Sequence, residues 1–140
     1  MRKFEFSLAR VLDYRLLLEE WAKDAYLEAQ LKRRRVDEAL EFLFRRREIV
    51  MAEEPQTVDD YRALSNYLDR LQDEERDLRA IQELMLADEE TARLDWVQKR
   101  QDAEALVKLK EKQEDEWKLE LSRWEQKQLD EWTTTRRKSA

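Results

Sequence analysis

Apolar residues recur along this chain at alternating steps of three and four residues, the spacing of a coiled-coil seam. Ten of thirteen such positions in the first half are apolar, and ten of fourteen in the second. The predicted seam positions are 8, 11, 15, 18, 22, 25, 29, 32, 36, 39, 43, 46 and 50, then 61, 64, 68, 71, 75, 78, 82, 85, 89, 92, 96, 99, 103 and 106. Continued from 110 to 131, the same register holds two apolar residues in seven. The pattern predicts two long helices, with the seam ending near Leu106.

The break between the two helices falls at Pro55, the single proline in a chain without glycine. Proline lacks the amide hydrogen and disfavours helix at the preceding residue, so a helix arriving from the N-terminal side should end by Glu54. The Thr57 hydroxyl can then cap the amide of Asp60 and start a second helix. We expect an all-α antiparallel coiled-coil hairpin in a single domain, with a C-terminal helix projecting beyond it. The expected bounds are about 4–52 for the first helix, 53–57 for the turn, 58–135 for the second helix and 136–140 for a tail.

Charge agrees with a hairpin folded about Pro55. If both helices rise equally per residue, facing residues have numbers that add up to roughly 111, and Leu8 faces about residue 103. Two basic runs, 32–35 and 45–47, then approach an acidic stretch of the second helix. Its carboxylates are Asp60, Asp69, Asp73, Glu74, Glu75 and Asp77.

The second helix is longer than the first can cover, which leaves residues from about 108 to 135 without an intrachain partner. Trp117, Leu121, Trp124 and Trp132 fall on one side of this part at helical spacing, with Leu129 nearby. An uncovered aromatic stripe is typical of a binding surface, and tryptophan is enriched at binding hot spots. The alternative is a fraying helix, or tryptophans lying on their own Lys and Arg stems.

Composition excludes most chemistry. Of 140 residues 44% are charged and the mean hydropathy is −0.98, which favours a long helix over a deep globular core. The absence of His, Cys and Gly removes the usual general base, the thiol nucleophile and the phosphate-binding loops, so we expect no enzyme activity, cofactor or metal. The acidic pairs Asp59-Asp60 and Glu89-Glu90 are expected to be solvated.

Net charge and hydropathy bear on partners and location. A net charge of −6 argues against a nucleic-acid partner, despite the arginine runs. The chain has no apolar run long enough to span a bilayer and no secretory signal at its start, so we expect a cytoplasmic protein.

Residues 4–15 read F-E-F-S-L-A-R-V-L-D-Y-R. This stretch is similar to the F-x-F-x-L-x-x-V-L-x-x-R opening of the FliJ family of flagellar type III export proteins, and the C-terminal part of the chain resembles the same family. Residues 106–112 read L-V-K-L-K-E-K, and residues 123–132 read R-W-E-Q-K-Q-L-D-E-W. These match the family's L-x-K-L-K-E-K and R-x-E-Q-K-x-L-D-E-aromatic signatures.

The resemblance implies a small coiled-coil stalk that inserts into the hexameric ring of the flagellar export ATPase. It also implies contact with the export gate protein FlhA and a part in handling export chaperones, with membrane association through these partners only. Ring-binding residues would be Trp117, Leu121, Trp124, Gln126, Lys127, Asp130, Glu131 and Trp132. The gate surface would hold Leu43, Tyr67 and Leu71. Arg46 and Val50 stand where the family can show aromatic residues, which departs from its gate pattern.

Two alternatives remain open from the sequence. A generic coiled-coil scaffold, such as a homodimer whose uncovered ends pair with each other, fits the same heptads. The equivalent stalk of a virulence-type secretion system would have the same fold.

Overall fold

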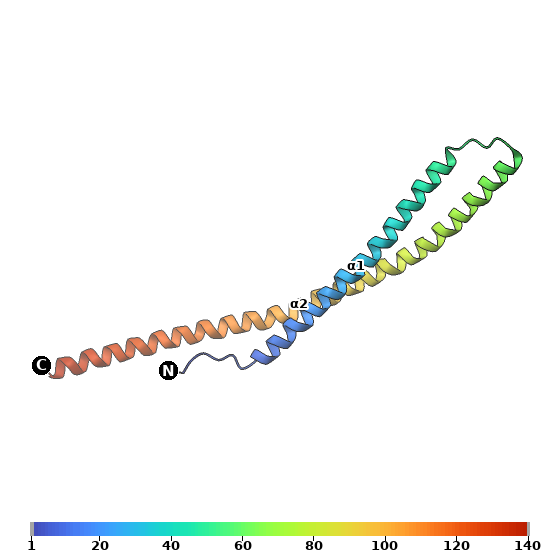
Figure 1. Ribbon diagram of the computed structural model, residues 1–140. Coiled ribbons are helices and arrows are strands. Elements are labelled where there is room, and N and C mark those ends of the chain that lie inside the picture. The colour runs from blue at the N-terminus through green and yellow to red at the C-terminus, as the bar shows by residue number, and fades with distance from the viewer. Residues whose placement is uncertain (1, 140) are drawn as a thin grey trace. The chain divides into compact units, whose positions relative to one another are not determined.

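A computed structural model describes residues 2–139 of the chain. It contains two helices, α1 (Ala9–Met51) and α2 (Val58–Ser139), with no strand among the described residues. The two helices pack against each other as a hairpin, and α2 is much the longer, at 82 residues against 43. Figure 1 shows the turn that joins them. The predicted all-α hairpin is confirmed.

The helix ends differ from the expected ones at both outer bounds. The first bond of α1 runs from the Leu12 amide to the Leu8 carbonyl at 2.9 Å, so the helix begins at Ala9 and not near residue 4. Residues 2–6 are not helical, and the Phe6 side chain in this irregular segment is buried, at 8% exposed. At the other end α2 continues to Ser139, where Arg136, Arg137 and Lys138 complement the helix dipole. The expected tail is therefore helical as far as it is described.

The turn follows its sequence signals closely. The Asp60 amide donates to the Thr57 hydroxyl oxygen at 3.0 Å, which confirms the predicted cap of α2. Asp59 and Asp60 occupy the first turn of α2, where negative charge meets the positive end of the dipole. On the other side, the last bonds of α1 run from the amides of Ala52 and Glu53 to carbonyls inside the helix.

The chain divides into two compact units, each described here by itself. One comprises Glu20–Val97 and includes the turn, and its most buried side chains are Ala22, Leu40, Leu43 and Leu71. The other combines Met1–Glu19 with Gln98–Ala140, and its buried side chains among the described residues are Phe6, Leu12 and Ala103. Both cores are thin, as two helices alone allow.

The seam predicted for α2 is confirmed over most of its length. Every predicted position from Leu64 to Leu106 is buried or half-buried, including the polar ones. Tyr61, the first position, is 63% exposed. Burial also continues past Leu106, through Leu109, Gln113 and Trp117 to Leu121, so the predicted end of the seam is wrong.

The seam on α1 is rotated relative to the prediction. Leu8, Val11, Ala25 and Lys32 are exposed, contrary to expectation. The positions that are buried or half-buried at three- and four-residue steps are 12, 15, 19, 22, 26, 29, 33, 36, 40, 43, 47 and 50. Leu12 and Tyr26 thus replace Val11 and Ala25, whereas Leu18, Ala39 and Arg46 are half-buried as predicted, each beside a residue of the new phase. Larger side chains fill more of the gap between two helices, which favours this phase.

The two helices pair in a register different from the expected one. In the unit Glu20–Val97, ion pairs join Arg33 to Glu89, Arg46 to Glu74 and Arg47 to Glu75. The numbers of each pair add up to about 120 instead of 111. Residues of the link, from Glu53 to Pro55, lie against the first turns of α2 at Asp60 and Leu64, so α1 meets α2 further along its length.

The register corrects several charge predictions. Arg46 and Arg47 reach Glu74 and Glu75, whereas the sum of 111 places this run near Asp60 and Asp69. Arg33, however, bonds to Glu89 and not to the region of Asp77. The side chain of Glu89 is only 15% exposed, so the prediction of a solvated carboxylate is wrong there, whereas Asp59, Asp60 and Glu90 are exposed.

Ion pairing shifts the titration of the groups involved. The hydrogen bond from Arg47, with a second from Arg79, lowers the pKa of Glu75 below its usual 4.5. The bond from Arg93 lowers the pKa of Glu90 in the same way. Bonding to Glu89 raises the pKa of the Arg33 guanidinium.

Candidate partner-docking site

The C-terminal segment of α2, residues 122–138, is uncovered on every side. All of its residues are exposed. Trp124 is 44% exposed, Leu129 56% and Trp132 57%. The segment remains helical because it contains no Gly or Pro and has local side-chain bonds, such as that from Gln126 to Asp130 at 3.2 Å. It is a helix with unburied apolar side chains.

The uncovered part is shorter than the sequence suggests, because the N-terminal residues cover α2 around Trp117. The indole nitrogen of Trp117 donates to the Arg2 carbonyl at 3.0 Å. The Phe4 ring lies 6.1 Å from the Trp117 ring, centroid to centroid. The prediction that residues from 108 onward lack an intrachain partner is therefore wrong, and the uncovered segment starts after Leu121. The F-x-F motif at residues 4–6 is the sequence feature that could have predicted this contact with Trp117.

The predicted ring-binding residues separate into three groups. Trp117 and Leu121 are half-buried. Trp124 and Trp132 are exposed, and at 100° per residue they lie on one side of the helix. The four polar residues, Gln126, Lys127, Asp130 and Glu131, all line one open groove with Arg123, Thr134 and Thr135. The structure thus brings the four polar residues together. Trp132 lies on the far side of the helix from this groove, whereas Trp124, seven residues before Glu131, lies beside it.

The side chain of Arg136, on the same helix, lies over the Trp132 ring. The Arg136 guanidinium carbon lies 5.0 Å from the centroid of the Trp132 ring. This is the contact that the alternative interpretation of the stripe predicts, with a ring resting on its own helix's basic side chain. Trp132 is still 57% exposed despite this contact, so its side chain remains accessible to a partner.

The gate surface predicted near the turn is only partly accessible. Leu43 and Leu71 are 0% and 2% exposed, which places them in the core of the unit Glu20–Val97. Their burial favours a role in packing α1 on α2 over direct contact with a partner. Tyr67 is half-buried, with the Arg70 guanidinium carbon 5.8 Å from its ring centroid.

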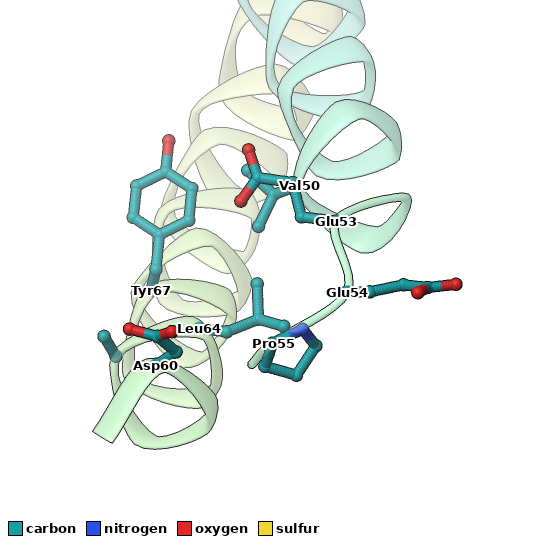
Figure 2. Close-up of a pocket in the computed structure, with 8 residues that line it drawn as sticks. Val50, Glu53, Glu54, Pro55, Asp60, Leu64 and Tyr67 are labelled. Atoms are coloured by element: carbon teal, nitrogen blue, oxygen red, sulfur yellow. The ribbon is translucent and has the colours of Figure 1, made fainter. Parts of the chain in front are cut away.

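Tyr67 lines a groove beside the turn. Val50, Pro55 and Leu64 contribute its apolar wall, and Glu53, Glu54, Ala63 and Asp60 complete it. Figure 2 shows Pro55 and Leu64 close together, with the Glu54 side chain pointing away from the groove. Of the three predicted gate residues, Tyr67 alone lies on an accessible surface.

Within residues 2–139 no three acidic side chains converge as metal ligands would. No helix among these residues is long and apolar enough to cross a membrane.

Comparison with known proteins identifies the family. The family described as flagellar FliJ protein matches residues 4–138, nearly the whole chain. Searches of curated proteins and of solved structures found no match. The match covers both the F-x-F opening and the uncovered segment of α2. The chain therefore belongs to the flagellar FliJ protein family and is a non-catalytic component of the flagellar export apparatus.

Proposed function

We propose that this protein is a stalk of the export apparatus. The C-terminal segment of α2 enters the hexameric ring of the flagellar export ATPase and couples it to the export gate protein FlhA. The observation that carries the proposal is the exposure of every residue from 122 to 138, with Trp124 and Trp132 among them. Exposed tryptophan on a rigid element is favoured as a binding anchor.

A ring suits this segment better than a partner on one side. Trp132 and the groove of Gln126, Lys127, Asp130 and Glu131 occupy opposite sides of the helix, and Trp124 lies between them. A partner lying along the groove would leave Trp132 in water. A socket that encloses the helix covers both.

The rest of the chain supports a coupling role. From Val58 to Ser139, α2 is one helix without Gly or Pro, the residues at which helices most often kink. Tyr67, in the groove beside the turn, is the residue we assign to gate contact. The cytoplasm is the expected location, with membrane association through partners only, and handling of export chaperones is a further role of the same stalk.

The ring contact is tested by ATPase stimulation. Adding the purified chain to the export ATPase should promote ring assembly and raise the hydrolysis rate. Trp124→Ala and Lys127→Glu should each reduce this stimulation. Ile49→Ala is the matched control, since Ile49 is 66% exposed but lies on α1. If the intact chain changes neither ring assembly nor the hydrolysis rate, the proposed stalk function is refuted.

Sedimentation at micromolar concentration tests the scaffold alternative. We expect the stalk to be a monomer, because residues 122–138 bind the ring and not a second copy of the chain. A stable dimer that Trp124→Ala dissociates would show instead that two uncovered segments pair with each other.

The gate contact needs its own assay. Tyr67→Ala should weaken binding to FlhA while leaving ATPase stimulation unchanged, because the residue lies outside the C-terminal segment. Unaltered FlhA binding would remove Tyr67 from the proposed gate surface.

A further inference from the structure

A second line of uncharged residues follows α2 on the side opposite its seam. Ala80, Leu84, Ala87, Thr91 and Leu94 are spaced by four and three residues in alternation. Each follows a seam position by two residues, about 200° further round the helix. All five are exposed, Leu84 at 63% and Leu94 at 54%. We call these five residues the outer seam, which lies wholly within the unit Glu20–Val97.

The outer seam has small and large residues in the arrangement that helix packing uses. Leu84 and Leu94 are large apolar side chains, and the alanines between and beside them let another helix approach closely. In a coiled coil, a partner helix packs against residues spaced by three and four in alternation. The face is thus suited to a third helix, and none of the described residues provides it.

The borders of the outer seam are acidic. Between Arg79 and Arg93 the chain has no Lys or Arg, and Glu83, Asp88 and Glu90 lie in this interval. Arg79 and Arg93 are held by Glu75 and Glu90 of the same helix. Glu83 and Asp88 form no ion pair within residues 2–139. Charges beside a coiled-coil seam select the partner, so this face selects a basic one.

A second copy of the chain is a poor occupant. Two outer seams face to face would bring acidic borders together, which is unfavourable. The corresponding face of α1, two residues beyond each seam position, is interrupted by charge. Five of the nine α1 residues on this face in the unit Glu20–Val97 are charged, namely Asp24, Glu28, Arg35, Glu38 and Arg45. Packing it against the outer seam would bury several of these charges.

We propose that the outer seam of α2 binds an amphipathic helix of another protein, whose apolar stripe is bordered by Lys and Arg. The partner packs along residues 80–94 of α2, on the side away from α1. This surface is distinct from the C-terminal segment, and the proposal does not depend on ring docking.

The test uses two designed peptides of about three heptads with the same Leu and Ala stripe. One has Lys and Arg at the flanking positions and the other has Glu. In a fluorescence anisotropy titration of the full chain, the basic peptide should bind at least about tenfold more tightly than the acidic one, and less tightly as salt rises. Equal binding of both peptides, or no binding of the basic one, would overturn the proposal.

Variants and mapping locate the peptide. The double variant Leu84→Ser with Leu94→Ser should weaken binding at least about tenfold. Phe42→Ser with Ile49→Ser is the matched control, because these side chains are 60% and 66% exposed on α1 and should leave binding unchanged. On the unmodified chain, amide chemical shifts should change mainly across residues 80–94. Changes centred elsewhere, or a homodimer that the Leu84 and Leu94 variant dissociates, would overturn the proposal.

Discussion

The middle of α2 and its C-terminal segment have similar sequences but very different surroundings. Both are highly charged, both lack Gly and Pro, and both carry large apolar residues at helical spacing. In the middle, Leu71 is 2% exposed against α1. In the segment 122–138, Leu129 is 56% exposed. The difference is the presence of a neighbouring helix, and periodicity alone does not reveal it.

The comparison separates helix formation from helix packing. Short isolated helices are marginal in water, whereas adding residues to an existing helix costs little nucleation. The C-terminal segment is thus an extension of a helix whose nucleus is stabilised elsewhere. Its apolar side chains contribute little to folding and remain available to a partner.

The largest expected effect is a matched pair of truncations. Leu71→Ala should lower the free energy of unfolding by about 2–5 kcal/mol, because it leaves a cavity between the helices. Leu129→Ala removes the same atoms from an exposed site and should change it by less than about 0.5 kcal/mol. Urea denaturation followed by circular dichroism measures both. Similar losses in the two variants would mean that the C-terminal segment is covered after all.

The next-largest expected effect is a difference in stability between two threonine substitutions, one at each end of α2. Thr57→Ala should cost about 1 kcal/mol, because it removes the oxygen that accepts the Asp60 amide. Thr133→Ala should cost nothing measurable, since the Thr133 hydroxyl bonds only to the Leu129 carbonyl within the helix and alanine is the better helix former. Thermal unfolding distinguishes them. A loss at Thr133 as large as at Thr57 would contradict this account of the cap.

A smaller effect is expected where the covered and uncovered parts meet. Phe4→Ala should remove the ring contact to Trp117, worth about 0.5–1.5 kcal/mol, and loosen the bond from the indole to the Arg2 carbonyl. In an NMR spectrum the indole N–H of Trp117 should then shift and exchange faster. The indole of Trp124 provides the internal control. If the Trp117 signal does not move, the N-terminal residues do not cover it.

The sequence predicts the helices and the cap of α2 because these depend on local chemistry. Thr57 and Pro55 act within a few residues of themselves, and the seam of α2 repeats without ambiguity. The symmetric fold about Pro55 does not predict the register because it ignores the link, which shares a groove with Asp60 and Leu64 of α2. The phase of α1 was missed because Val11 and Leu12, or Ala39 and Leu40, fit the same spacing.

The candidate site shows the same limit. Family motifs identify the segment around Lys127 and Asp130, and the structure places these residues in one groove. Leu43 and Leu71 are also predicted seam positions, so the periodicity predicts their burial and conflicts with the gate contact that the resemblance implies. Motif position alone could not reveal the cover of Trp117, which depends on a contact between opposite ends of the chain.

The smallest expected effect is a difference in acid sensitivity. Arg47 holds the pKa of Glu75 below its usual 4.5, so the ionised form is favoured by folding. The stabilisation is complete above the unfolded pKa and is lost as the pH falls through the lower folded pKa. Glu75→Gln removes it at every pH. The unfolding temperature of the native chain should therefore fall slightly more between pH 7 and about pH 3 than that of Glu75→Gln.

Glu125→Gln is the matched control for this titration, because Glu125 is exposed in the uncovered segment. Many other carboxylates titrate over the same range, and comparing each variant with the native chain cancels their contribution. Since Glu75 bonds to Arg47 across the helix pair and Glu125 has no residue of α1 beside it, only the first substitution should reduce the acid-induced fall. Equal reductions would mean that the effect reports net charge, and that the pairing of α1 with α2 contributes nothing to it.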